Sequence, residues 1–504
     1  MTPERVSPTQ QPLGFDYDEG HSEQNLTALA GIPLLVQAFR SLDLPRSVGR
    51  HVCVKQRQRG LDEASYVESF IILNAAGGEC LDDFARLRQD GVRGLIGHEL
   101  PSPEAARKFL YQFHDEQLIE QAQQRLLPGQ TSYIPEENAP LRGLGQVNID
   151  LVRELARRGE PQKIATIDLD STIMESWKQQ AQPTYQGGRG YQPMLAVWAE
   201  MNLIVCDQFR DGNVPAQQEP LEAARRAFCS LPENVTEFYF RGDSACYEKN
   251  LIGWLRDEHR EGGPHGAIGF AISVRLHPSL KQHIARLPAS AWKPYREDGE
   301  AVSECADVLN YWPEAEEEKE FGPLRWVAIR VRKRQGDLFG DGAEAKHFAV
   351  VTNVWDWETR RLLEWHREKA GTIEAIHDVL KNELAAGVLP CARFGANAAW
   401  LRMAVLTHNL ITALKRMALP EQYLSARPKR LRFLIFNTAG RILHHARRTL
   451  CRIAAVGWRG LAAADADARI GLKRIGVRIL KTRLTVWSAA VCLTCCWFPS
   501  AVQR

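Results

Sequence analysis

The segment that decides the fold is Lys163–Thr172, which reads KIATIDLDST. Its side chains alternate between two faces, one with Ile164, Thr166, Asp168 and Asp170 and the other with Ala165, Ile167 and Leu169. A period of two residues indicates a β-strand. We therefore predict a strand that ends at Asp170, directly before Ser171.

The elements after this strand predict an α/β fold. Two strands, a helix and a fourth strand follow, at Met194–Ala199, Leu203–Cys206, Pro220–Leu231 and Glu237–Phe240, and the fourth strand leads into the corner Arg241–Ser244. Three consecutive strands, a helix and a fourth strand are the opening order of the ribonuclease-H-like fold. We predict such an α/β core, preceded by a helical region.

Acidic residues end two of the predicted strands. Asp170 ends the first strand and Asp243 ends the fourth, and these strands are neighbours in a ribonuclease-H-like sheet. A third carboxylate would come from a helix across the sheet. Thr372–Leu384 has that pattern, because Glu374 lies on its polar face and an isoleucine and leucine stripe lies opposite.

Carboxylates in these positions suit cleavage of a phosphodiester by two metal ions. That chemistry needs carboxylates that converge on two ions about 3.5–4 Å apart. Magnesium keeps several of its waters, so a few carboxylates suffice. We predict Asp170, Asp243 and Glu374 as the catalytic residues and as the ligands of two Mg²⁺ ions, for which Mn²⁺ can substitute.

Asp168 shares a strand face with Asp170, about 6.6–7 Å away along the strand. Asp170 has the position before a Ser that matches Asp243, which favours Asp170 as the metal ligand. Asp168 is then predicted to support a ligand or Lys381 from behind. Asp378, which follows Glu374 by four residues on the same helix face, is a second candidate for a supporting role.

Three motifs together resemble bacterial insertion-sequence DDE transposases. They are the strand Thr166–Thr172, the corner Arg241–Ser244, and Glu374 with Lys381 seven residues later. Within the wider insertion-sequence-4-like superfamily, the chain is most similar to the thirteen-eighty family, whose closing signature resembles His366–Glu374 and Phe394–Trp400. The resemblance implies a homodimer that cuts DNA at the transposon terminal inverted repeats and joins the ends to target DNA.

The sequence departs from the superfamily in one respect. A tyrosine and an arginine, seven and four residues before the glutamate, contact DNA there, but this chain has Arg367 and Ala370. We therefore assign the phosphate contacts to Arg367, Lys369 and Lys381.

The spacing of these motifs divides the chain. The 130 residues between Asp243 and Glu374 are too many for a loop within one domain, and related transposases have a β-strand insertion there. From Arg427 to Arg483 there are fifteen Lys or Arg and two acids. We expect a disordered N-terminus at 1–25, the helical DNA-binding region at 26–160, the core at 161–260 and 356–425, the insertion domain at 261–355 and a basic tail at 426–504.

Composition restricts the protein's setting. The 11 cysteines have no zinc-ligand spacing, residues 1–25 have no hydrophobic signal core, and the apolar run Val486–Phe498 is shorter than the roughly 20 residues of a membrane span. We expect a cytoplasmic, nucleoid-associated bacterial protein without a membrane partner.

Two other functions stay open. One is a catalytically inactive or domesticated DNA-binding protein, against which the three intact acids argue. The other is a ribonuclease-H-like nuclease that cuts without joining strands.

Overall fold

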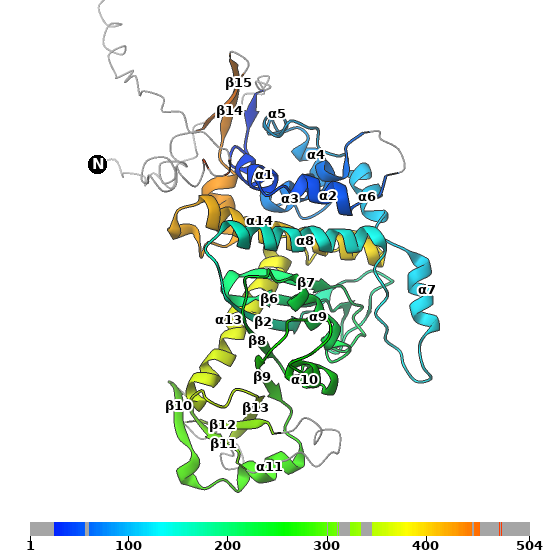
Figure 1. Cartoon of the computed structure of the whole chain (residues 1–504). Coiled ribbons are helices and arrows are strands. Elements are labelled where there is room, and N and C mark those ends of the chain that lie inside the picture. The colour runs from blue at the N-terminus through cyan, green and yellow to red at the C-terminus, as the bar shows by residue number, and fades with distance from the viewer. Residues whose placement is uncertain are drawn as a thin grey trace, which may run out of the picture.

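The computed structural model describes residues 25–55, 60–299, 301–309, 311, 323–333, 345–445 and 448–453, with the single positions 473 and 475. It is a mixed α/β structure with a helical layer above a large mixed sheet (Figure 1). The predicted disordered segment 1–25 lies outside the described residues except for residue 25.

The N-terminal region is helical after the short strand β1 (Leu26–Thr27). Side-chain caps begin several of its helices; Ser102, for example, accepts a hydrogen bond from the Ala105 amide, as its place before Pro103 predicts. The helices are α1 (Ile32–Ser41), α2 (Leu44–His51), α3 (Glu63–Ala76), α4 (Asp83–Leu87), α5 (Arg93–Ile96), α6 (Pro103–Tyr111), α7 (Glu116–Gln124) and α8 (Ala139–Arg158).

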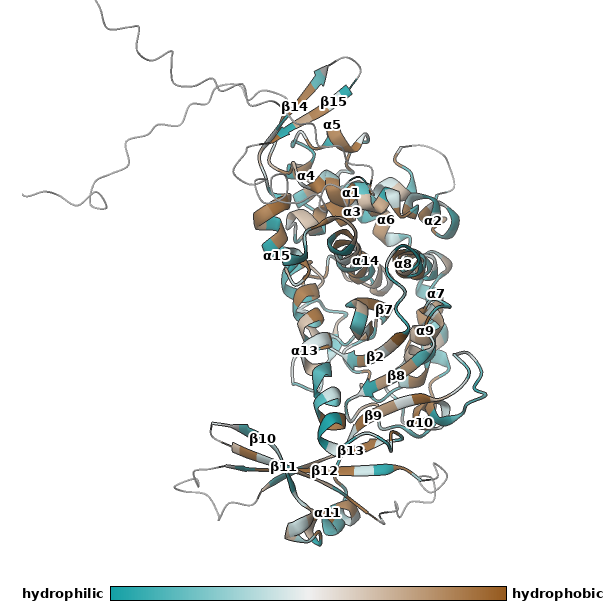
Figure 2. Ribbon diagram, turned by 60° about the vertical axis from the view of Figure 1, so that its left-hand side comes forward, coloured by the Kyte–Doolittle hydropathy of each residue, from teal (hydrophilic) through white to brown (hydrophobic). Residues whose placement is uncertain are grey.

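Five strands form the part of the sheet that holds the predicted acids. In sheet order they are β7 (Leu203–Gln208), β6 (Met194–Trp198), β2 (Ile164–Ser171), β8 (Glu237–Gly242) and β9 (Ile268–Val274). The pairs β7–β6 and β6–β2 are antiparallel, whereas β2–β8 and β8–β9 are parallel. The parallel pairs are joined through α9 (Pro220–Ser230) and α10 (Lys249–Arg256). Figure 2 shows hydrophobic colour along much of β9, which is mostly buried, whereas β8 is mixed in colour and only its second half is buried.

The predicted domain boundary at residue 261 is wrong for the next strand. Residues 261–355 were expected to form a separate insertion, but β9 pairs with β8 in the core sheet. The sheet then continues through β13 (Lys346–Thr352), β12 (Arg325–Lys333), β11 (Ala301–Asp307) and β10 (Lys293–Asp298), with α11 (Pro278–Ala285) beside them. The sequence of an apolar strand looks the same whether the strand belongs to the core sheet or to a separate insertion domain, because the strand with which it pairs is distant in sequence.

Two long helices complete the structure. Helix α13 (Thr359–Glu383) runs along the sheet from β10–β13 to the helical layer (Figure 1). Helix α14 (Phe394–Ala418) is buried around nearly its whole circumference between the sheet and the N-terminal helices. The buried Asn409 bonds the Ile204 backbone and Asn148, whereas the buried hydroxyl of Thr412 has no hydrogen-bond partner among the described residues.

The small sheet of β3 (Met174–Glu175), β4 (Gln182–Pro183) and β5 (Arg189–Tyr191) follows β2. Short 3-10 helices lie at Ala199–Met201, Ala289–Ala291 and Glu421–Tyr423. Within the described residues, no helix is both long enough and apolar enough to cross a membrane.

The first part of the predicted basic tail from 426 is folded. It comprises α15 (Pro428–Leu431), a π-helical turn (Arg432–Phe436), β14 (Gly440–His445) and β15 (Arg448–Ile453). Strand β14 pairs with β1, and a Cβ on Gly31 would lie 2.0 Å from the Ile435 carbonyl oxygen, so residues 26–31 and 435–441 are in close contact. This contact between distant segments has no local sequence signal. Apart from 473 and 475, residues 454–504 lie outside the described residues.

Candidate active site

Asp170 and Asp243 lie level with each other at the ends of two adjacent strands. In the parallel pair β2–β8, the last partners are Leu169 and Gly242, and each aspartate is the next residue. The predicted neighbourhood of these two strands is therefore confirmed. Gly242 is required by space, because a Cβ there would lie 2.5 Å from the Cβ of Cys246. The chain turns sharply at this point and presents Asp243 beside Asp170.

A lysine ammonium group lies at the two aspartates. Lys369 Nζ is 3.0 Å from Asp170 Oδ2, and only 10% of the lysine side chain is exposed. Burial alone would lower the pKa of Lys369, but the charges of Asp170 and Asp243 outweigh it and raise that pKa. Burial raises the pKa of Asp243, and Lys369 opposes the rise. Lys369 was predicted to bind phosphate, but here its charge is directed at the carboxylates.

A buried ion pair lies one pleat deeper in the sheet. Arg241 Nε and Nη2 bond the two carboxylate oxygens of Asp168 at 2.6 and 3.0 Å, and their side chains are 2% and 0% exposed. Thr372 of α13 donates a short hydrogen bond to Asp168. Arg241 also bonds the Trp365 carbonyl at 2.5 Å and Glu368 at 3.1 Å. Asp168 therefore accepts hydrogen bonds from Arg241 and Thr372. The predicted contact between Asp168 and Lys381 is not among its hydrogen bonds, because Lys381 bonds Thr172 instead.

Two histidines on the buried face of α13 were missed by the sequence analysis. His366 Nε2 lies 3.2 Å from the Gly242 carbonyl oxygen, and burial lowers the pKa of His366 to about 4. Burial lowers the pKa of His377 to about 3. Both are thus neutral near pH 7. The signal was available, because both share the helical period of Lys369, Ile373 and Leu380.

Glu374 lies on a flank of α13 with Arg367 and Lys381, since residues seven apart nearly superimpose along a helix. Glu374 is exposed, and it has no hydrogen bond or ion pair among the described residues. Lys381 Nζ lies 2.9 Å from Thr172 Oγ1, just past the end of β2. The exposed Arg367 is within hydrogen-bonding reach of Tyr295. In the described part of the chain, no three His, Cys, Asp or Glu side chains are grouped closely enough to hold a metal ion.

Asp378 does not lie at the candidate site. It bonds Asn382 at 2.5 Å and forms a short ion pair with Arg427, and almost half of its side chain is exposed. The expected supporting role is corrected, because this contact ties α13 to the chain before α15 and not to the two aspartates.

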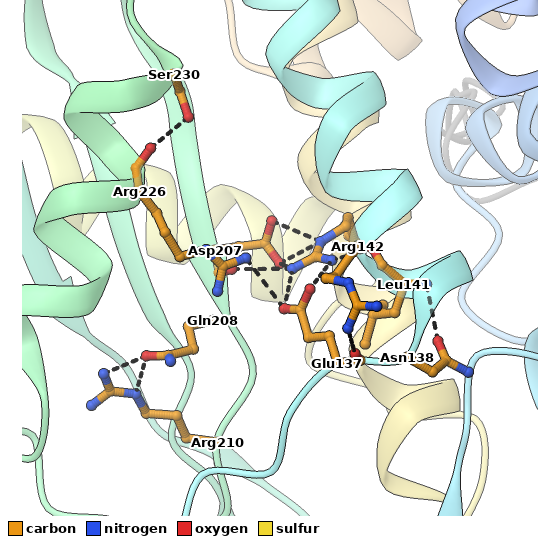
Figure 3. Close-up of polar contacts among 10 residues, drawn as sticks. Glu137, Asn138, Leu141, Arg142, Asp207, Gln208, Arg210, Arg226 and Ser230 are labelled. Atoms are coloured by element: carbon orange, nitrogen blue, oxygen red, sulfur yellow. Dashed lines mark hydrogen bonds and ion pairs between the residues drawn. The ribbon is translucent and has the colours of Figure 1, made fainter. Parts of the chain in front are cut away.

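A second charged cluster lies between α8, β7 and α14 (Figure 3), and its Asp207 is level with Asp170 two strands across the sheet, with Leu195 of β6 between them. Arg402 bonds Asp207 at 2.9 Å and Glu137 at 2.8 Å, and Arg226 approaches Glu137. Burial disfavours the charge of Glu137, but Arg402 and Arg226 lower its pKa to about 2. A cavity of about 570 Å³ adjoins this cluster. Because the buried charges pair within the protein, we assign them to the packing of the helical layer on the sheet.

Comparison with protein families identifies the family of this chain. Among curated proteins, no sequence matches this chain. A similar solved structure is the cryo-EM structure of the piggyBac transposase synaptic complex with hairpin DNA, at 9% identity and a TM-score of 0.42, over 78% of this chain and 77% of that chain. The family model described as "Transposase DDE domain group 1" matches residues 20–465. The chain therefore belongs to the group 1 family of transposase DDE domains.

Proposed function

We propose that this protein is a metal-dependent DNA transposase of the thirteen-eighty kind, which cleaves DNA at transposon ends and joins those ends to target DNA. The observation that carries the proposal is the level placement of Asp170 and Asp243 at adjacent strand ends. Carboxylates fixed close together on a sheet can hold metal ions that stabilise the attacking and leaving oxygens of a phosphodiester. Family membership supports DNA as the substrate.

The sheet supports a ribonuclease-H-like core. Its strand order β7–β6–β2–β8–β9 has three antiparallel strands followed by two that run parallel to β2. That is the expected arrangement, with the first and fourth strands as neighbours. The strands β10–β13 extend this core as its insertion.

The two aspartates fit a divalent cation. Lys369 already supplies a positive charge at 3.0 Å from Asp170, so this position accepts a cation in the folded protein. Asp170, Asp243 and Glu374 would hold two Mg²⁺ ions, or Mn²⁺ in their place. When bound, such ions neutralise charge on the phosphate and favour attack by water or by a 3′-hydroxyl.

The residues around the aspartates would position the DNA. His366, neutral and bonded to the Gly242 carbonyl, holds the end of β8 where Asp243 begins. Lys381 and Arg367 lie on the flank of α13 that carries Glu374, and there they can contact phosphates. Lys369 can do so only after it leaves Asp170.

Two transposon ends must be brought together, so we propose a homodimer on DNA. We assign recognition of the terminal repeats to the helices α1–α8. Basic residues in this region, such as Lys108 and Arg93, are exposed and can neutralise phosphates.

The test is a reaction of the full chain with its own DNA ends and Mg²⁺. Inverted repeats bordered by short direct duplications, beside the gene, would identify these ends. Cleavage followed by joining to a plasmid is the expected result. Cleavage without joining would replace the proposal with a nuclease, and specific binding without cleavage would replace it with an inactive DNA-binding protein.

A further inference from the structure

The hairpin of β14 and β15 projects from the helical layer, at the end of the molecule opposite β10–β13 (Figure 1, Figure 2). Its base is fixed to the body, because Ile442 is only 2% exposed. Gly440 also packs closely there, since a Cβ on it would lie 2.7 Å from the Cβ of Ala30. Farther out on the same face, His444 and Thr449 are exposed. The tip of the hairpin therefore extends beyond the body.

The other face of the hairpin carries arginines. Side chains alternate along a strand, so Arg441, Arg448 and Arg452 share the face opposite Ile442, and all three are exposed. The guanidinium groups of Arg448 and Arg452 form no ion pair or hydrogen bond within the part of the chain that the structure describes. This face therefore presents positive charge to the surroundings of the protein.

The charge of this face is not balanced by its own strands. Arg441 and Arg452 are direct cross-strand partners, and like charges in that position destabilise a sheet. Residues 422–464 contain nine Lys or Arg and no Asp or Glu. A Thr–Thr pair or a pair of opposite charges would serve the sheet better at the same exposed position. The arrangement therefore indicates an anionic partner outside the chain.

We infer that the face with Arg441, Arg448 and Arg452, here called the arginine face, binds the phosphates of duplex DNA. The inference adds a DNA contact outside the helices α1–α8, and it rests on the proposed function in taking DNA as the substrate. Family membership supports DNA as the polyanion that this chain meets.

The dimensions of the hairpin fit a duplex. Adjacent strands lie about 4.7–4.9 Å apart, and the major groove, about 12 Å wide, admits a ribbon of two strands. Arg448 and Arg452 are four residues apart, which is about 13–14 Å along the strand. That separation is close to the width of the groove, so the two guanidinium groups can reach phosphates on both of its edges. Between them, Leu443 and Leu450 pair across the strands and are half-buried.

The arginine face is continuous with the helices to which DNA recognition is assigned. Strand β1 leads into α1, and its Leu26 pairs with Arg441. On the other side of the hairpin, a hollow of about 480 Å³ is lined by residues that include Arg93 of α5 and His444. A duplex on the hairpin would therefore lie beside α5, and one DNA molecule can contact both.

The test measures the affinity of the full chain for duplex DNA by fluorescence anisotropy, without metal, from about 50 to 200 mM salt. Arg448→Gln and Arg452→Gln should each flatten the slope of log affinity against log salt by about 0.9, and the double variant by about 1.8. The change should be the same for terminal-repeat and scrambled DNA, because phosphates carry no sequence information. Arg452→Lys keeps the charge and should retain the parental slope.

Arg332→Gln is the matched control. Arg332 is an exposed arginine on a strand as well, 55% exposed, but it lies on β12 at the opposite end of the molecule. This variant should keep the parental slope. Thermal unfolding separates binding from folding, because Arg452→Gln removes a like-charge pair and should not lower the Tm. If that variant nevertheless loses its native circular dichroism spectrum, Arg448→Gln near the tip gives the same measurement.

The outcomes distinguish this inference from the proposed function. A parent chain that does not bind duplex DNA at about 50 mM salt would overturn the proposed function itself. Parental slopes in both glutamine variants, in a chain that binds DNA, would overturn only the arginine face. An equal flattening in Arg332→Gln would overturn it too. Parental DNA slopes with lost binding to phosphatidylserine vesicles would assign the face to a membrane surface instead.

Discussion

Asp170 Oδ2 lies 3.0 Å from Lys369 Nζ, although 199 residues separate the two in sequence. The contact places a buried ammonium group where the proposed function requires a divalent cation. Under the proposed function, the lysine and the metal ions would compete for the same carboxylate charge, and the response of the protein to metal would depend on Lys369.

Lys369→Met should make the protein less stable without metal and more responsive to it. The substitution leaves Asp170 and Asp243 without their buried counter-charge, which typically costs about 3–5 kcal/mol of unfolding free energy. Mg²⁺ would no longer have to displace an ammonium group. Thermal unfolding with and without Mg²⁺ should show a larger rise in Tm for the variant than for the parent. Equal rises would show that Lys369 and the metal do not compete.

The Glu137 cluster of Figure 3 should make stability sensitive to acid. The pKa of Glu137 falls from 4.5 to about 2 on folding. The contribution of this carboxylate to the free energy of unfolding is therefore present above pH 4.5 and is lost as the pH falls toward 2. At pH 7 this contribution is on the order of 3 kcal/mol. Urea unfolding of the parent and of Glu137→Gln should give a difference in free energy that shrinks between pH 5 and pH 3. A difference independent of pH would contradict the ion pair.

The strands that carry the two aspartates were predictable because their signals are local. Alternation defines β2, and both Asp170 and Asp243 directly follow paired strand residues. Asp168 and Asp170 have the same local pattern, and only burial separates them: Asp168 is 0% exposed and paired with Arg241. Sequence periodicity cannot report which carboxylate has a cationic partner on the next strand.

The parts that the sequence did not predict depend on pairing between distant segments. Strand β9 joins β8 in the core sheet, and β14 joins β1. The sequences of β9 and β14 do not indicate the strands with which they pair. Lys369 was predicted as a phosphate contact because its charge was evident, whereas its burial against Asp170 depends on how α13 crosses β2.

Arg367→Gln should weaken DNA binding through the loss of one phosphate contact. The side chain is exposed on the flank of Glu374, so a change there does not disturb the core. The slope of log affinity against log salt should fall by about one unit, and the loss should be similar for all DNA sequences. Asp378→Asn is the control on the same helix. An unchanged slope would remove Arg367 from the DNA interface.

Truncation should separate the folded and basic parts of the C-terminal segment. Removal from Pro428 onward deletes the buried Leu431, Ile435 and Phe436, and it should lower the Tm strongly. Removal after Ile453 spares these contacts. That shorter deletion removes the buried Ile475, so it should lower the Tm less than the longer deletion does, and it should flatten the salt dependence of DNA binding. A steep salt slope retained after the shorter deletion would exclude the tail as a phosphate-binding element.

The proposed cleavage depends most directly on the two level aspartates, and single-turnover cleavage of the element's own terminal DNA with Mg²⁺ tests their role. Asp170→Asn and Asp243→Asn should each abolish cleavage while DNA binding stays within about twofold of the parent, since neither neutral side chain can hold the ions. The control Asp378→Asn should cleave at the parental rate. Cleavage by Asp170→Asn at or near the parental rate would contradict the central claim.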